Sequence, residues 1–359
     1  MKSAFFPIMT LLSVILLNAC RGVGSPSAIQ PTIVSNTNTI TFPSATPEPT
    51  RFPDVTLKIN SSPLTSFAPI FIAEAEGYFK EFGLKMEYIT FNKSNDAVPL
   101  VITGDLDVYA GSVNAGILNI LRQETNIRVV ADKGHISPGD SCTYMGLLVR
   151  KDLYDSGKIT DPAGLKGQTI AATTSGTTGY LLSTYLAQAG LTFKDVVLND
   201  IPTAGFLDAF ANKSVAVIGA PELHLSRLIN GGNAVLLAGA EHVVGAEQLG
   251  FIAFGKNLLV DHPDIGARFL AAYLKGVKQY NEGKTDRNLQ IMADATGETI
   301  ETLKASCWVP INSDGLIDFS GVAGFQQWSI AQGQLEAPVN EEQFFDPRFI
   351  SAAQALLNP

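Results

Sequence analysis

The sequence predicts an α/β protein of two related lobes, preceded by an apolar segment and a polar linker. Three observations predict it. Strand and helix patterns alternate from Asp54 onward, one pattern of helix, turn, apolar strand and glycine occurs twice, and 359 residues are enough for about two domains. Because 46% of the residues are hydrophobic and few are cysteine, the composition excludes a disordered chain and a disulfide-stapled miniprotein.

The charge balance argues against several classes of function. The formal net charge is −9, whereas a general affinity for nucleic acid needs a cationic face. Four histidines and three scattered cysteines leave little for a metal cluster. The common catalytic motifs, such as the P-loop and the nucleophile elbow, are absent. The composition therefore favours a binding protein over an enzyme, and no cofactor or metal is expected.

Residues 1–20 predict a lipoprotein signal peptide. Lys2 supplies a positive charge, and the apolar run from Phe5 to Leu17 has the length of a signal-peptide core rather than of a membrane span. The run ends in Leu-Asn-Ala-Cys, which resembles a bacterial lipobox, although Asn is unusual two residues before the Cys. We expect lipid on Cys20. An ordinary signal peptide or short anchor with an incidental cysteine is the alternative.

Residues 21–53 form the predicted linker. They are rich in Pro, Thr and Ser, carry few charges and show no apolar periodicity. Such a segment cannot bury enough surface to offset the entropy lost on ordering. We expect an extended tether that holds the folded part just outside a membrane, and a prosequence that is later cleaved is the alternative.

The first half of the folded part alternates strands with helices. Apolar periodicity and turn residues predict strands at 55–59, 84–90, 107–110 and 127–131, and helices at 68–79, 94–102 and 113–123. This order is typical of βαβ units, which indicate a mainly parallel sheet.

A second round of the same pattern begins near Tyr144. Its predicted strands are 144–150, 168–172, 196–200, 215–219 and 234–238, and its helices are 180–189, 204–211 and 221–229. A last strand at 251–254 precedes helices at 263–280, 286–295, 298–306 and 319–332. We expect this helical tail to return to the first lobe because its connections are short, and a third independent unit is the alternative.

Two similar stretches indicate where a ligand would bind. Residues 100–111 and 207–219 both read as helix, turn, short apolar strand and glycine, followed by a helix. Two related lobes leave a cleft between them, and ligands of open α/β sheets bind beyond the carboxyl ends of the strands. The loops at those ends therefore hold the candidate contacts.

The candidate ligand contacts are polar, small or aromatic residues of these loops. They are Ser66, Phe67, Tyr109, Ser112, Asn114, Ser175, Gly176, Thr177, Thr178 and Glu222. The group 175–178 precedes a helix, whose N-terminus can bind an anion. Each candidate also has a structural interpretation: core packing for the aromatic residues, helix capping for 175–178, and a favourable helix dipole for Glu222.

Two histidines and two cysteines are further candidates. His135 lies in a glycine-rich stretch, 132–141, and is a candidate lid residue, whereas His224 lies with Glu222 at the start of the helix predicted over 221–229. Cys142 and Cys307 either form a disulfide, which an oxidising compartment permits, or remain two free buried thiols.

Four stretches in one order carry motifs of a single family. The most specific is 67–84, with a Gly-Tyr-Phe turn closed by Gly-Leu; the others are 100–110, 147–153 with 161–167, and 220–222. Gly164 stands where the family usually has Asp, and Val215 replaces a usual acidic residue. Over most of residues 54–300 the chain resembles the solute-binding lipoproteins of ABC importers that bind sulfonates, nitrate, taurine and the pyrimidine precursors of thiamine.

The resemblance implies a type 2-like periplasmic-binding-protein (Venus flytrap) fold with two crossover strands, near 145–148 and 250–253, and a C-terminal helical tail on lobe 1. Lobe 1 would comprise 54–145 and 253–359, and lobe 2 would comprise 146–252. It also implies a monomer that is lipid-anchored outside the bacterial cytoplasm. Such a protein captures a small molecule and delivers it to an ABC permease and its ATPase.

The candidate loops also predict a ligand class. They contain no Arg or Lys, which a sulfonate or nitrate site favours. They offer hydroxyls, an amide, aromatic rings and the acid Glu222. We therefore predict a planar nitrogen heterocycle, such as a thiamine-type pyrimidine or a flavin. The alternatives are a sulfonate, taurine or nitrate binder, a pyrimidine-synthesis enzyme on the same scaffold, and a membrane-tethered sensor input.

Overall fold

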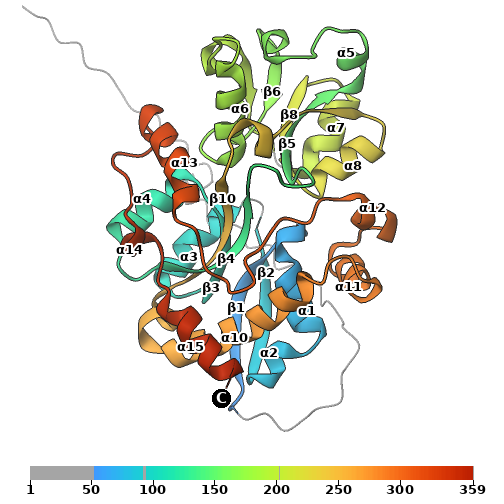
Figure 1. Cartoon of the computed structure of the whole chain (residues 1–359). Coiled ribbons are helices and arrows are strands. Elements are labelled where there is room, and N and C mark those ends of the chain that lie inside the picture. Colours follow the sequence, from blue (N-terminus) through green and yellow to red (C-terminus); the bar gives the residue numbers. More distant parts are fainter. Residues whose placement is uncertain (1–51, 92–93, 202, 359) are drawn as a thin grey trace, which may run out of the picture. The chain divides into compact units, whose positions relative to one another are not determined.

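The computed structural model describes residues 52–91, 94–201 and 203–358 (Figure 1). The predicted signal peptide, Cys20 and almost all of the linker lie outside these residues. Within them the strands form two five-stranded sheets, each the centre of one lobe. No helix in the described ranges is both long and apolar enough to cross a membrane.

The first sheet has the strand order β2-β1-β3-β10-β4. Its strands are β1 (Val55–Ser61), β2 (Leu84–Thr90), β3 (Val108–Ser112), β4 (Arg128–Ile136) and β10 (Glu247–Phe254). Strand β1 pairs in parallel with β2 and β3, whereas β10 runs antiparallel to β3 and β4. Because β10 returns from the second lobe, the first lobe is built from separate parts of the chain.

The second sheet has the order β7-β6-β8-β5-β9. Its strands are β5 (Met145–Arg150), β6 (Thr169–Ala171), β7 (Val197–Asn199), β8 (Val217–Pro221) and β9 (Ala234–Gly239). Strand β6 is parallel to β7 and β8, and β5 is antiparallel to β8 and β9. Both sheets are therefore mixed rather than mainly parallel. Residues 145–148 lie in β5 and residues 250–253 in β10, the first strand after each passage between lobes.

Helices connect the strands. In the first lobe they are η1 (Thr65–Phe67), α1 (Ala68–Ala75), α2 (Tyr78–Glu81), η2 (Ser94–Ala97), α3 (Val98–Thr103) and α4 (Ala115–Gln123). In the second lobe they are α5 (Lys151–Asp155), η3 (Pro162–Leu165), α6 (Thr177–Ala187), η4 (Phe193–Asp195), η5 (Thr203–Gly205), α7 (Phe206–Ala211), α8 (His224–Asn230) and α9 (Ala240–Val243). Short 3₁₀ turns are labelled η in both lobes.

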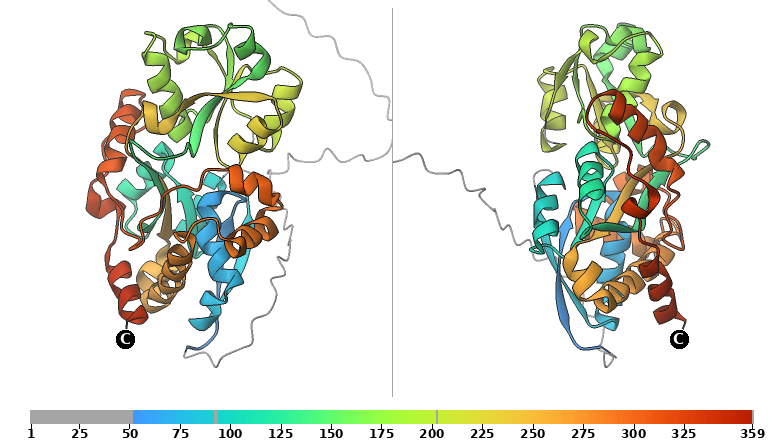
Figure 2. Two further views of the ribbon diagram at one scale, coloured as in Figure 1. Left: turned by 45° about the vertical axis from the view of Figure 1, so that its right-hand side comes forward. Right: turned by 90° about the vertical axis from the view of Figure 1, so that its left-hand side faces the viewer.

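The C-terminal tail packs on the first lobe, in line with the prediction (Figure 2). It comprises η6 (Asn257–Asp261, one π-helical segment), α10 (Pro263–Tyr280), α11 (Asp286–Thr296), α12 (Ile300–Ala305), α13 (Ser320–Ala331), α14 (Glu341–Phe344) and α15 (Arg348–Leu357). Helix α10 contacts α1, α2 and α15. Phe269 on α10 stacks on Phe79 at 5.3 Å between ring centroids, so this helix forms part of the first-lobe core. The tail also reaches the second lobe, where α13 contacts α6 and α12 contacts α8.

The elements around Gly77 and His135 differ from the sequence expectations. The helix predicted over 68–79 is divided into α1 and α2, because Gly77 has a left-handed φ of 74° that a continuing helix cannot contain. Strand β4 continues to Ile136 because it pairs with β10 from Glu247 onward. His135 therefore lies in the sheet, where its Nδ1 is 2.9 Å from the Asp132 carboxylate, and its predicted role as a lid residue is wrong.

Candidate ligand-binding site

A pocket of about 70 Å³ lies between the two lobes. Leu64, Ser66, Ser112, Lys133, Gly134, Leu249 and Gly250 line it from the first lobe, and Tyr144, Met145, Thr177, Thr178 and Pro221 line it from the crossover and the second lobe. Its wall combines apolar side chains with hydroxyls and one ammonium. Within the described ranges, no three His, Cys, Asp or Glu side chains gather as metal ligands do.

The lobes touch each other beside this pocket. The backbone N–H of Ala115 donates to the carbonyl oxygen of Ser175 at 3.0 Å, and Asn114 and Gly176 form a β-bridge. In the tail, the amide of Gln334 donates to the carbonyl oxygen of Thr174 at 3.1 Å. The pocket is therefore small because the walls of the cleft are already in contact.

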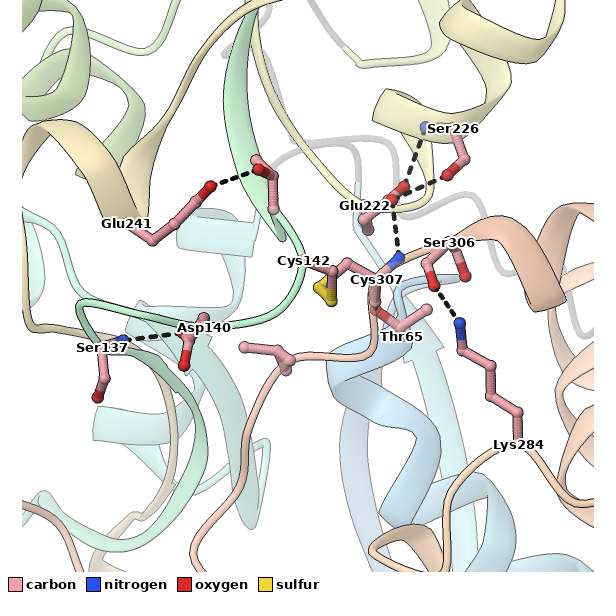
Figure 3. Close-up of a disulfide and its surroundings, with 12 residues drawn as sticks. Thr65, Ser137, Asp140, Cys142, Glu222, Ser226, Glu241, Lys284, Ser306 and Cys307 are labelled. Carbon is pink, nitrogen blue, oxygen red and sulfur yellow. Dashed lines mark hydrogen bonds between the residues drawn. A yellow bond between two sulfur atoms is a disulfide. The ribbon is translucent and has the colours of Figure 1, made fainter.

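A second set of contacts joins the lobes near the disulfide (Figure 3). The backbone N–H of Cys307 in the tail donates to Glu222 Oε1 at 2.9 Å, and Arg227 on α8 forms an ion pair with Glu298. The sulfurs of Cys142 and Cys307 are bonded, with 5.5 Å between the Cα atoms. Of the two states that the sequence left open for these cysteines, the structure has the disulfide.

Four predicted contacts line the pocket: Ser66, Ser112, Thr177 and Thr178. Ser66 lies in η1, the first helical turn after β1, and Ser112 is the last residue of β3. Thr177 and Thr178 begin α6, whose N-cap residue Gly176 provides no side-chain cap. The loops that follow β1, β3 and β6 therefore meet at the cleft, as expected for the carboxyl ends of strands.

The other predicted contacts have mainly structural surroundings. Ser175 and Gly176 contact the first lobe through their backbones. Asn114 caps α4, since its Oδ1 accepts from the N–H of Ile117 at 3.0 Å. The rings of Phe67 and Tyr109 are buried, and they pack on Phe71 and Phe251 at centroid distances of 6.2 and 5.8 Å.

Glu222 is buried and does not line the pocket. Its carboxylate accepts hydrogen bonds from the N–H and the hydroxyl of Ser226 and from the N–H of Cys307, at 3.0, 2.8 and 2.9 Å. Burial raises the pKa of Glu222, and these hydrogen bonds partly oppose that shift. Nearby, His224 packs edge-on against Phe206, and burial lowers its pKa to about 4. Neither residue offers its charge to the pocket.

Lys133 lines the pocket, and the sequence analysis did not single it out. It is only 1% exposed. Its Nζ donates to Ser66 Oγ at 3.1 Å and lies 4.4 Å from the ring centroid of Phe67. Burial lowers the pKa of Lys133 to about 7, and the negative charge of Asp132 opposes the shift. The candidate loops do lack Arg and Lys, but the pocket contains a cation, so that ground for preferring a heterocycle no longer holds.

Tyr144 is the second pocket residue that the sequence analysis did not select. It is the last residue before β5 and is buried. Its hydroxyl hydrogen-bonds with Ser66, and burial raises its pKa to about 12. Ser66 thus links a lysine and a tyrosine in one polar group at the cleft. Residues 132–135 around Lys133 carry no apolar pattern, and Tyr144 begins the predicted strand 144–150, which indicates a sheet residue rather than part of a site.

Two α/β lobes with a pocket between them are the architecture of the two-lobed periplasmic-binding-protein fold. The chain belongs to the NMT1/THI5-like family, whose family model matches residues 64–282. One curated relative, the riboflavin-binding protein RibY of Chloroflexus aurantiacus, is 25% identical over 275 residues, which are 74% of this chain and 71% of the relative.

Solved structures share the fold at low sequence identity. The ligand-binding component of an ABC-type import system from Staphylococcus aureus, solved with zinc bound, has a TM-score of 0.70 at 16% identity, covering 83% of this chain and 98% of that one. The alkanesulfonate-binding protein SsuA of Xanthomonas axonopodis pv. citri, bound to MOPS, has 0.64 at 18%, covering 79% and 95%. The desulfurization enzyme DSZB has 0.61 at 15%, covering 84% and 99%.

Proposed function

We propose that this protein is the solute-binding component of an ABC importer and that it captures a flavin-like planar heterocycle between its two lobes. The observation that carries the proposal is the pocket to which both lobes contribute side chains. A solute that contacts both walls stabilises the closed arrangement and so shifts the equilibrium between open and closed protein toward the closed state. Membership of the family and the fold shared with an ABC import component support this class of function.

The proposed place of action is outside the cytoplasm. Lipid on Cys20 and the linker 21–53 would tether the folded part, as a monomer, beside its permease and ATPase. The disulfide between Cys142 and Cys307 supports an oxidising compartment, since structural disulfides persist there and are rare in the cytosol.

The flavin-like ligand is supported by the relative that binds riboflavin and by the composition of the pocket wall. Leu64, Met145 and Leu249 provide apolar contacts for a flat ring system, while Ser66 and Lys133 provide donors for ring carbonyl oxygens. The pocket is smaller than the roughly 300 Å³ that a drug-sized ligand needs. The lobes must therefore move apart to admit such a ring.

An anionic solute is the second candidate, and Lys133 is the observation that favours it. A buried ammonium and a helix N-terminus both attract oxyanions. The alkanesulfonate-binding protein with the same fold supports this candidate. One argument for a thiamine-type pyrimidine no longer applies, since Glu222 does not line the pocket.

Titration decides between these candidates. Purified protein is titrated with riboflavin, an aminopyrimidine, taurine and nitrate, and mass spectrometry identifies any solute that copurifies. We expect riboflavin to bind and to raise the thermal unfolding midpoint further as its concentration increases above the dissociation constant. If only taurine or nitrate binds, the ligand is an anion and the flavin proposal is wrong.

Two further measurements address the role of the protein. Because an enzyme shares the fold, recovery of the bound solute unchanged after long incubation supports binding without turnover. A permease and an ATPase encoded beside this protein would favour an importer over a sensor input.

A further inference from the structure

We propose that Lys133 selects the solute: its ammonium donates hydrogen bonds to an acceptor-rich or anionic edge of the ligand and excludes cationic solutes. This inference rests on the proposed binding function, but it does not depend on the ligand being a flavin. It assigns to the pocket a class of ligand chemistry that the apolar wall and the hydroxyls do not define by themselves.

The ammonium of Lys133 lies at the pocket wall, where a solute can reach it. Lys133 and its partner Ser66 both line the pocket, so the Nζ–Oγ hydrogen bond of 3.1 Å lies at the pocket wall. A lysine ammonium has three N–H donors. Among the residues that the structure describes, Ser66 Oγ is its one hydrogen-bond acceptor, and the Phe67 ring lies against it at 4.4 Å. Donors therefore remain for a solute.

Among the described residues Asp132 contributes a negative charge near Lys133, but the two side chains form no ion pair. Asp132 is its sequence neighbour, but the Asp132 carboxylate accepts from Gly134 N, Gln248 Nε2, His135 Nδ1 and Asn312 N, at 2.7, 2.8, 2.9 and 2.8 Å. No ion pair joins Lys133 to any described carboxylate. A buried, unpaired cation is costly. An acceptor on the solute would lower that cost, which is a direct source of binding free energy.

The opposite wall favours the same kind of ligand. Thr177 and Thr178 line the pocket at the start of α6, a helix of 11 residues. The N-terminus of a helix carries partial positive charge and unpaired N–H groups. The lysine on the first lobe and the helix on the second lobe thus both attract electron-rich atoms. A flavin imide edge, a sulfonate or a carboxylate satisfies this requirement, whereas a cationic amine does not.

Proton uptake is a second consequence of the same geometry. The titratable groups around the ammonium are Asp132 on its own strand, His135 bonded to Asp132, Tyr144 through Ser66, and Glu222 close to Tyr144. Burial in the closed arrangement brings the pKa of Lys133 to about 7, so without a solute the closed protein has a mostly neutral amine above that pH. An acceptor in the pocket favours the ammonium, and binding to the closed arrangement should therefore take up protons in mildly alkaline solution.

The test compares Lys133→Met with Lys158→Met in the full chain. Lys158 is exposed on the second lobe and serves as the matched control. Calorimetric titrations use riboflavin, taurine and the cation thiamine at pH 6 and pH 8.5, in buffers of different ionisation enthalpy. We expect Lys133→Met to weaken binding of the probe that the wild type prefers by about tenfold or more. Lys158→Met should leave it unchanged.

The pH dependence distinguishes a ligand contact from a merely structural lysine. We expect wild-type affinity to fall between pH 6 and pH 8.5 with measurable proton uptake, and Lys133→Met to show neither effect. Folding of the variant is checked by its unfolding midpoint, which should not fall, because methionine removes an unpaired buried charge. The proton uptake of the wild type tests the proposal without any variant.

The outcomes separate this inference from the proposed ligand. If the wild type binds riboflavin and Lys133→Met binds it equally well with the same proton uptake, the role of Lys133 is overturned while the flavin remains. If the wild type binds taurine alone and Lys133→Met loses it, the role of Lys133 stands and the flavin is replaced. Tight binding of thiamine to the wild type would also overturn the selection of acceptor-rich solutes.

Discussion

The backbone N–H of Cys307 donates to the carboxylate of Glu222 at 2.9 Å, from the C-terminal tail of the first lobe to the second lobe (Figure 3). The side chain of the same Cys307 is bonded to Cys142, in the segment that leads into β5. Three parts of the chain, the tail, the second lobe and the crossover segment, therefore meet at one residue. Parting of the lobes has to break the hydrogen bond, while the disulfide keeps the tail next to the crossover.

The first prediction concerns this disulfide, which closes a loop with a sequence separation of 165. The double variant Cys142→Ala, Cys307→Ala should lose about 2–5 kcal/mol of unfolding free energy, because a crosslink over a long loop restricts the unfolded chain. Urea unfolding measures the loss. Ser141→Ala is the matched control, because Ser141 is the exposed neighbour of Cys142 and is outside the disulfide. An unchanged midpoint for the double variant would contradict a stabilising role.

The regular elements of the fold were predictable from sequence periodicity, because burial on one or both faces dictates apolar spacing. Strand β2 and helix α10 match the prediction at both ends. The extension of β4 through Lys133 was not predictable, because residues 132–135 are Asp, Lys, Gly and His and carry no apolar pattern. That stretch is a strand because β10, more than a hundred residues later, pairs with it.

The candidate site was predictable only as far as loops at strand ends define it. Ser66, Ser112, Thr177 and Thr178 line the pocket because each lies at or after the end of a strand that points toward the other lobe. Glu222 also follows a strand, but a tail residue 85 positions later in the chain occupies its carboxylate. Long-range partners of this kind have no local signal, so the sequence analysis placed Glu222 in a pocket that contains Lys133 instead.

The second prediction concerns Glu247, a fully buried carboxyl group at the start of β10. Among the described residues neither of its oxygens has a hydrogen-bond partner, and burial raises its pKa well above the usual value. A raised pKa in the folded state means that stability is fully present in acid, below the unfolded value of about 4.3, and is lost as pH rises toward the folded value.

Replacing Glu247 by Gln should therefore remove this loss. We expect the free energy of unfolding of Glu247→Gln to exceed that of the wild type by more than about 1 kcal/mol at pH 8, and to equal it near pH 4.5. Unfolding in urea at both pH values measures the difference. The exposed substitution Glu87→Gln is the control and should leave the pH profile unchanged. Equal stability of Glu247→Gln and wild type at pH 8 would show that the carboxyl group is accessible to solvent in the folded protein.

The third prediction concerns Gly179, in the first turn of α6. A Cβ at this position would lie 2.7 Å from the carbonyl oxygen of Thr173 and 2.8 Å from the backbone of Thr174. Gly179→Ala must displace this loop from the helix, which moves Thr177 and Thr178 at the pocket. We expect riboflavin affinity to fall by about tenfold, since binding groups must be held within about 0.5 Å. Ser183→Ala, on the same helix, should bind normally in the same titration.

The fourth prediction concerns Cys20, which lies outside the described residues. A single acyl chain anchors a protein only marginally, whereas several chains on one cysteine anchor it firmly. Cys20→Ser should release soluble protein or leave an unprocessed precursor. Fractionation of cells into membrane and soluble parts measures the shift. An identical distribution of variant and wild type would exclude the lipid anchor.

The fifth prediction concerns opening of the lobes. A pocket of about 70 Å³ cannot admit a flavin while Ala115 and Ser175 remain hydrogen-bonded across the cleft. We expect the unliganded protein in solution to be more open than this structure, and saturating riboflavin to reduce its radius of gyration in small-angle scattering. An unchanged radius, with binding confirmed separately, would show that the lobes do not hinge.

A crosslink across the cleft makes the same prediction more specific. Ala115→Cys with Ser175→Cys places two thiols on backbones that are already hydrogen-bonded. Once oxidised, this variant should be locked closed and should associate with riboflavin far more slowly than the wild type, because the route into the pocket is blocked. Mild reduction should restore the rate, and wild-type protein under the same reducing conditions provides the control. Rapid association with the locked variant would mean that the solute reaches the pocket without separation of the lobes.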